Sequence, residues 1–151
     1  HIAIAPTKNI DRLEWFLEKA TEIGIDRITP IICSRSERKT IKPERLQKIL
    51  VSAMKQSNQA YLPQFNPAIS ITSFFHQVEK LENQQLFIAH CEENRKEELG
   101  LKYTKGHRCI ILIGPEGDFS TEEINSAIQN GFQPITLGKN RLRTETAGLV
   151  A

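Results

Sequence analysis

The chain has 151 residues, 39% hydrophobic and 25% charged, which is enough to bury one hydrophobic core. A net charge of +2, from 20 basic and 18 acidic residues, argues against a protein that holds nucleic acid by charge alone, although a local basic face is compatible with it. No apolar run approaches the length of a membrane span, and there is no signal-peptide pattern. Three cysteines without C-x-x-C spacing favour a reduced, cytoplasmic setting.

Short apolar runs alternate with amphipathic segments along the whole chain. The runs predict strands at residues 1–5, 28–32, 86–89, 109–113 and 134–137. The amphipathic segments predict helices at residues 10–23, 43–54, 74–81 and 121–130, and from 144 or 145 onwards. Strands that alternate with helices are typical of βαβ units. We therefore predict an α/β fold with a mostly parallel sheet and helices on both faces.

Several punctuation signals mark the ends of these elements. Pro30 lies inside a predicted strand and indicates an edge or a bulge. Residues 61–67 contain two prolines and predict a loop, and residues 92–98 form a polar run. Thr72 or Ser73 is expected to cap the third helix.

The stretch around residue 114 joins a strand to a helix through a glycine turn. Residues 109–113 are apolar throughout, as in a strand buried on both faces, and Gly114-Pro-Glu-Gly117 ends that strand. Ser120 with Glu123 then has the spacing of a capping box. In an open α/β sheet such a turn lies at the carboxyl end of a strand, where ligands bind.

A second glycine turn, Leu137-Gly138, also follows a predicted strand and leads into a basic segment. Two such turns from adjacent parallel strands would place backbone N–H and C=O groups around one crevice. The first turn is neither a P-loop nor a G-x-G-x-x-G fingerprint. Taken alone, its two glycines are equally consistent with a tight turn that binds no ligand.

The basic stretch 35–45 has two interpretations. In the first, it is a solvated face, since it also contains acidic residues. In the second, it makes phosphate contacts with RNA. On the second interpretation the contacting side chains are Arg35, Arg38 and Lys39.

Other reactive residue types are interpreted structurally. His90-Cys91 has no second pair at ligand spacing, so no metal site is predicted. Trp15 lies beside the apolar stripe of the first helix and is expected to pack there. Cys109 is expected to act as a small hydrophobic residue within its strand.

Two segments resemble the signature of the RsmE family, which are SPOUT-class methyltransferases of bacterial ribosomal RNA that use S-adenosylmethionine. The segments are Gly114-Pro-Glu-Gly-Asp-Phe-Ser120 and Leu137-Gly-Lys-Asn-Arg-Leu-Arg-Thr-Glu-Thr-Ala147. Glu18-Lys-Ala-Thr-Glu-Ile-Gly24, Arg35-Ser36 and Gln56-Ser57 resemble further motifs of the family. The likeness therefore covers nearly the whole chain.

The chain departs from the family pattern at two places. Asn58-Gln59 stands where the family frequently has Gly-Arg, and Asp118 stands where many members have Gly. The family's small N-terminal RNA-binding domain has no counterpart in residues 1–151, which we expect to be a SPOUT methyltransferase domain cut from a longer protein.

The resemblance implies a fold whose C-terminal part forms a trefoil knot, and a homodimer that binds S-adenosylmethionine in the knot. It implies methylation of N3 of a uridine in 16S ribosomal RNA, in the small ribosomal subunit, without a metal and without a membrane. The alternative is a non-catalytic RNA- or nucleotide-binding module that uses the glycine turns as an anion site.

The expected site residues are carried by the two signature segments. Cofactor-binding residues would be Leu112, Ile113, Gly114, Glu116, Gly117, Leu137, Gly138, Leu142, Arg143 and Thr146. The catalytic candidates are Glu116 and Glu145, as carboxylates that could accept the uridine proton, and Arg143, as a bidentate donor. Glu145 is equally interpreted as an ordinary first-turn helix carboxylate.

Overall fold

One sheet of parallel strands forms the centre of the computed structural model, which describes residues 1–79, 81–92 and 96–151. Its order is β3-β2-β1-β7-β5-β8-β6, and β4 also pairs with β2. The strands are β1 (Ile2–Ile4), β2 (Arg27–Ile32), β3 (Gln64–Phe65), β4 (Ile69–Ser70), β5 (Gln84–Ala89), β6 (Glu97–Glu98), β7 (Arg108–Ile113) and β8 (Gln133–Thr136). The sequence-based prediction of a parallel sheet is confirmed.

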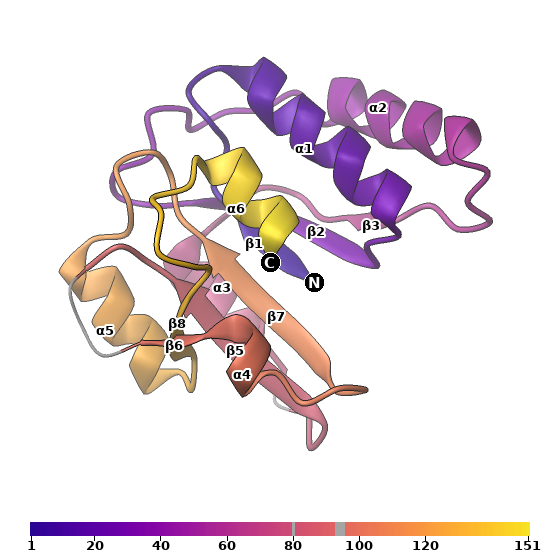
Figure 1. Ribbon diagram of the computed structural model, residues 1–151. Helices are drawn as coiled ribbons and strands as arrows, with labels where there is room; N and C mark the ends of the chain where they lie inside the picture. The colour runs from indigo at the N-terminus through magenta and orange to yellow at the C-terminus, as the bar shows by residue number, and fades with distance from the viewer. Residues whose placement is uncertain (80, 93–95) are drawn as a thin grey trace.

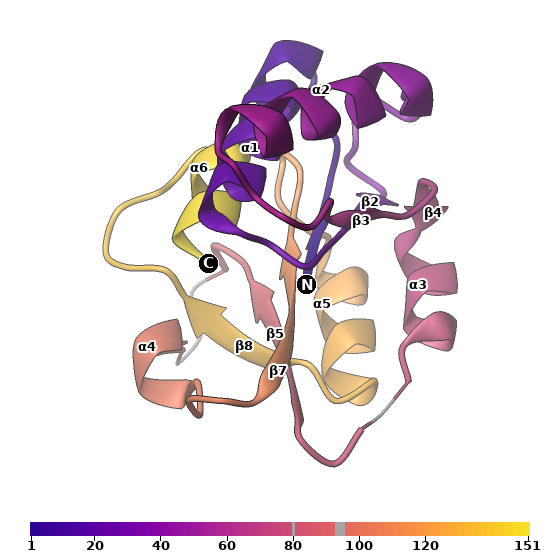
Figure 2. The same cartoon turned by 90° about the vertical axis from the view of Figure 1, so that its right-hand side faces the viewer.

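Helices cover both faces of this sheet, as predicted (Figures 1 and 2). They are α1 (Ile10–Ile23), α2 (Pro43–Gln56), α3 (Ile71–Gln77), α4 (Leu99–Lys102), α5 (Thr121–Gln129) and α6 (Thr144–Val150). One core cluster joins the sheet to α3 and α5, and a second joins the opposite face to α1 and α2. Alternation along β7 divides its side chains between the two clusters, with Leu112 in the first and Ile113 in the second.

The helix starts and stops agree with the local signals in the sequence. Ser120 and Glu123 form the predicted capping box at the start of α5. Gly24 ends α1 with φ = 101°, a left-handed conformation that glycine adopts without steric cost. Pro43 occupies the first turn of α2, where its missing N–H costs nothing.

Pro30 lies at a gap in the sheet and not at its edge. β2 pairs with β1 on one side, where Pro30 is opposite Ile4. On its other side it pairs with β3 through Arg27 and Ile28, and with β4 from Ile31 onwards. Pro30 therefore falls between two short neighbouring strands, where a missing backbone donor breaks no ladder hydrogen bond.

Several element boundaries differ from the sequence-based prediction. Ser70, not Thr72 or Ser73, caps α3, because its hydroxyl accepts the N–H of Ser73, and the helix ends at Gln77. The predicted loop 61–67 contains β3. In the polar run 92–98, residues 93–95 lie outside the described residues, and β6 occupies its end.

The position of Trp15 also corrects the prediction. Its side chain is 44% exposed on the outer face of α1, whereas the neighbouring Phe16 is fully buried in the core. Trp15 thus lies beside the apolar stripe of α1, as predicted, but packs there only in part.

After β8, the chain crosses back over the sheet to place α6 against α1, β1 and β7 (Figure 1). The trefoil knot implied by the family resemblance stays a prediction. No helix in the described part of the chain is both long enough and apolar enough to cross a bilayer.

Candidate functional site

A cavity of about 320 Å³ lies at the carboxyl ends of β5 and β7. Its walls come from the ends of these two strands, from the turn that follows β7, and from the segment that leads into α6. The lining residues are Ala89, Cys91, Ile113, Gly114, Pro115, Glu116, Asp118, Arg141, Leu142, Arg143, Thr144 and Ala147. This is the edge at which open α/β sheets bind ligands, as the glycine turns predicted.

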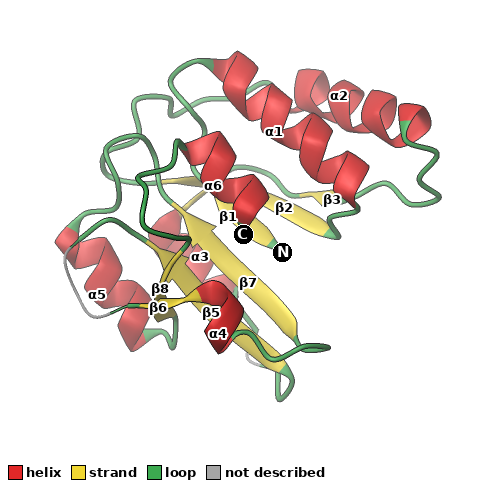
Figure 3. Ribbon diagram, viewed as in Figure 1, coloured by secondary structure: helices red, strands yellow, loops and turns green. Residues whose placement is uncertain are grey.

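Part of the predicted cofactor set lines this cavity, namely Ile113, Gly114, Glu116, Leu142 and Arg143. Leu137 and Gly138 line a second cavity of about 540 Å³, which α4 and the end of α6 help to form. The long irregular loop 137–143, which Figure 3 draws between β8 and α6, thus contributes residues to both cavity linings.

The remaining predicted cofactor residues lie outside both cavity linings. The Leu112 side chain is fully buried in the core cluster on the other face of the sheet. A Cβ at Gly117 would lie 3.3 Å from the Cβ of Arg35, so this glycine accommodates the Arg35 side chain. Thr146 is half-buried on α6.

The turn after β7 owes its shape to Gly114 and Asp118. A Cβ at Gly114 would lie 3.1 Å from two ring atoms of Phe119, so only glycine allows this ring to pack so closely. The positive φ of the turn falls on Asp118, at 64°, and not on either glycine. Glycine adopts such an angle freely, which would account for the glycine that the family resemblance led us to expect at this position.

The Asp118 carboxylate connects two walls of the cavity. One oxygen accepts the N–H of Cys91, after β5, at 2.7 Å, and the other accepts the N–H of Phe119 at 2.9 Å. A second link joins the same segments, because the Thr121 hydroxyl donates to the carboxylate of Glu92 at 2.7 Å. The only sequence signal for this role was the departure from glycine at position 118.

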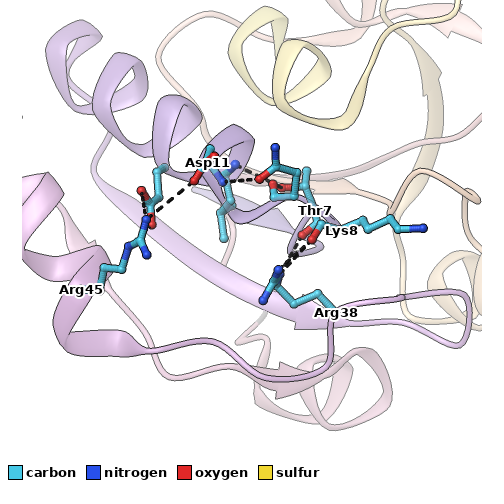
Figure 4. A network of polar contacts seen from close by, with 8 residues as sticks. Thr7, Lys8, Asp11, Arg38 and Arg45 are labelled. Atoms are coloured by element: carbon cyan, nitrogen blue, oxygen red, sulfur yellow. Dashed lines mark hydrogen bonds and ion pairs between the residues drawn. The ribbon is translucent and has the colours of Figure 1, made fainter.

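Glu116 and Arg38 both hold the loop between β1 and α1. The Glu116 carboxylate accepts the N–H of Lys8 at 2.9 Å. The Arg38 guanidinium donates to the carbonyl of Lys8 at 2.8 Å and to that of Thr7 at 3.1 Å (Figure 4). The Lys8 ammonium pairs with Glu37 at 2.8 Å.

Arg35 braces the turn after β7 from the other side. Its guanidinium donates to the carbonyls of Gly117 at 3.0 Å and Phe119 at 3.1 Å. The guanidinium groups of both predicted RNA-binding arginines, Arg35 and Arg38, therefore bind backbone carbonyls, while Lys39 is exposed.

The three residues at the start of α6 differ sharply in environment. Arg143 is exposed and lines the cavity, and the buried Thr144 hydroxyl donates to the carbonyl of Gly114 at 3.1 Å. Glu145 is 7% exposed and lies outside the cavity lining. One of its oxygens lies 3.8 Å from Arg12 of α1, and the other has no hydrogen-bond partner among the described residues. Glu145 therefore lies in the first turn of α6, as one of its two interpretations expected, but its carboxylate is buried.

His90 is buried between the cavity residues Ala89 and Cys91. Neither ring nitrogen has a hydrogen-bond partner among the described residues. Burial lowers the pKa of this imidazole, and the nearby Lys96 ammonium lowers that pKa further. The described part of the chain has no group of three or more His, Cys, Asp or Glu residues able to hold a metal ion.

Comparisons with known proteins agree with this architecture. The model of the RNA methyltransferase domain family matches residues 1–151. The chain is 31% identical to a ribosomal RNA small subunit methyltransferase E from Rickettsia conorii, over 99% of this chain and 61% of that protein. It therefore spans about three fifths of that relative's length.

Two solved structures show the same fold. A probable rRNA-methyltransferase from Porphyromonas gingivalis has a TM-score of 0.90 and 46% identity, over 99% of this chain and 63% of its own. A ribosomal RNA small subunit methyltransferase E from Neisseria gonorrhoeae, bound to S-adenosyl methionine, has a TM-score of 0.86 and 30% identity. That match covers 98% of this chain and 61% of the other. Because the family model spans every residue, this chain belongs to the RNA methyltransferase domain family, as a relative of the small subunit methyltransferase E proteins.

Proposed function

We propose that this chain is the catalytic domain of an enzyme that uses S-adenosylmethionine to methylate N3 of a uridine in small-subunit ribosomal RNA. The observation that carries the proposal is the cavity at the ends of β5 and β7, which the two signature segments line. The relative from Neisseria gonorrhoeae, whose fold is similar, binds S-adenosyl methionine.

The residues of the cavity fit this cofactor in size and in chemistry. Its volume of about 320 Å³ is within the range of ligand pockets, which is about 300–1,000 Å³. Ile113 and Leu142 offer apolar surface to the adenosine part. Arg143 offers a positive charge to the carboxylate of the methionine part. Leu137 and Gly138 would extend the site toward the second cavity.

The cofactor supplies an electrophilic methyl group when it is bound. The protein must then orient the uridine and accept the proton that its N3 carries. We assign proton acceptance to Glu116, since this residue lines the cavity and is exposed. Glu145, by contrast, lies outside the cavity lining and next to Arg12. Arg143 would hold a carboxylate or phosphate by two parallel hydrogen bonds.

We also propose that the working unit is a homodimer in the cytoplasm. On α1, Trp15 is 44% and Ile23 is 74% exposed, and on α6 Val150 is 53% exposed. These large apolar side chains are exposed on two helices that contact each other, and such exposure favours a protein interface. Light scattering at micromolar concentration tests this, and a particle of 17.2 kDa alone would contradict it.

Calorimetry tests the proposed cofactor site directly. We expect saturable binding of S-adenosylmethionine, with ATP and inorganic phosphate binding far more weakly. Transfer of tritium from labelled cofactor to unmodified small ribosomal subunits, followed by mass spectrometry of the nucleosides, tests the reaction. Tight binding of ATP without any methyl transfer would favour the non-catalytic nucleotide-binding module instead.

A further inference from the structure

The basic side chains in the loops around the cavity fall into two groups. In the first group, the charged atoms already bind the protein itself. Arg35 and Arg38 donate to backbone carbonyls, and Lys8 pairs with Glu37. These cations stabilise the loops around the cavity. Their charge is partly neutralised by the carbonyl and carboxylate groups that they bind.

The second group consists of Lys139, Arg141 and Arg143 in the loop that follows β8. All three side chains are exposed, and none takes part in an ion pair within the described residues. Leu142 is half-buried between the two arginines, and all three of these residues line the cavity. The apolar side chain thus alternates with two exposed cations along this part of the loop.

Within the part of the chain that the structure describes, the carboxylates of the cavity form no ion pair with these cations. Glu116 accepts the backbone N–H of Lys8, and Asp118 accepts that of Cys91. Three exposed positive charges within five residues therefore form a local basic patch, although the whole chain carries a formal charge of only +2.

We propose that Lys139 and Arg141 contact the phosphate backbone of RNA beside the cavity, which Arg141 lines, while Arg143, the third cation of this basic patch, faces the cofactor. Phosphates are the anions that guanidinium groups bind with two hydrogen bonds, and such contacts position RNA without reading its sequence. The inference rests on the proposed function, and it assigns the RNA contact to this loop in place of Arg35 and Arg38. A strand held here would place a base beside the cofactor cavity.

The experiment measures how RNA affinity depends on salt. The test variant is Lys139→Gln with Arg141→Gln, and Arg143 is retained because it is assigned to the cofactor site. The control variant is Lys48→Gln with Lys55→Gln, which removes the same charge from exposed positions on α2. Fluorescence anisotropy with a labelled single-stranded oligouridine between 0.05 and 0.5 M salt (about a tenfold range) gives the slope of log K against log salt for each protein.

Each phosphate contact to a single strand contributes roughly 0.7 to this slope. Loss of two contacts is expected to reduce the slope by about 1.4 and to weaken binding about 25-fold at about 0.1 M salt, while the control keeps the wild-type slope. Equal slopes in the test variant and the wild type, equal losses in both variants, or no RNA binding by the wild type would overturn the proposal.

Two further arms separate the alternatives. Polyaspartate that displaces the oligouridine at equal charge would show a site for acidic protein and would also overturn the RNA assignment. Calorimetry with S-adenosylmethionine on the same samples tests the proposed function separately. If the wild type fails to bind S-adenosylmethionine but the slopes differ as expected, the RNA patch stands and the cofactor site fails.

Discussion

At Gly148, α6 lies very close to its neighbours. A Cβ at this position would lie 2.7 Å from Cε2 of Phe16 and 3.0 Å from Cδ1 of Ile4. Both neighbours are fully buried, so neither can move aside without disturbing the core. We therefore expect Gly148→Ala to destabilise the protein by overpacking.

The magnitude follows from two opposing effects. Overpacking a core costs about 1–3 kcal/mol. Alanine in place of glycine in a helix recovers about 1 kcal/mol. Gly100→Ala on α4 is the matched control, because nothing lies within 4 Å of its Cβ. The helix effect is common to both variants, so their free energies of unfolding should differ by the overpacking cost alone, about 1–3 kcal/mol.

Urea denaturation followed by circular dichroism measures both free energies. For a chain of this size, each kcal/mol corresponds to about 2–4 °C in Tm, so thermal scans provide a second check. Because α6 begins at Thr144, which donates to the carbonyl of Gly114, the same displacement should weaken binding of S-adenosylmethionine. Two variants of equal stability would refute the claim that close packing requires glycine here.

Three further outcomes are expected. Arg143→Lys should change the free energy of unfolding by less than about 0.5 kcal/mol, because the side chain is exposed, yet lower methyl transfer by about tenfold or more, since lysine cannot form two parallel hydrogen bonds. The control is Arg108→Lys, because Arg108 is exposed at the start of β7. Unchanged turnover of Arg143→Lys would show that Arg143 is not part of the site. Asp118→Gly removes the acceptor of the Cys91 N–H, so the exposed Cys91 thiol should react faster with a thiol reagent; an equal rate would contradict this link. Because burial lowers the pKa of His90 from 6.5, the unfolded chain binds its proton more readily, and stability should fall as pH drops below about 6.5. Urea titrations at about pH 7.5 and 5.5 should show this loss in the wild type and a smaller one in His90→Gln, and identical losses would argue against the buried imidazole.

The features that were predicted correctly are those whose interacting atoms lie within a few residues of one another. The capping box at Ser120 and Glu123 is of this kind, and so are the end of α1 before Gly24 and the start of α2 at Pro43, which match the predicted bounds. The alternation of strands and helices, and so the parallel sheet, also follows from local periodicity. The resemblance of two signature segments then pointed to the RNA methyltransferase family, which the family comparison confirmed.

Boundaries were less predictable where several local signals compete or where pairing is distant. Ser70, Thr72 and Ser73 can all cap a helix, and Ser70 does so because β4, which pairs with β2, ends at that residue. β3 is only two residues long and forms because it pairs with β2, more than thirty residues earlier in the chain. No periodicity can be read from so short a segment.

The environments of the site residues were decided by tertiary packing. Local sequence shows that Glu145 begins a helix, but only the docking of α6 against α1 buries it beside Arg12. Similarly, Arg35 and Arg38 resembled solvent-facing cations until the loops after β1 and β7 brought carbonyl groups to them. Charge type is a property of the residue. Whether that charge faces a phosphate, a carbonyl or a buried carboxylate depends on segments that lie far apart in the chain and meet only in the folded protein.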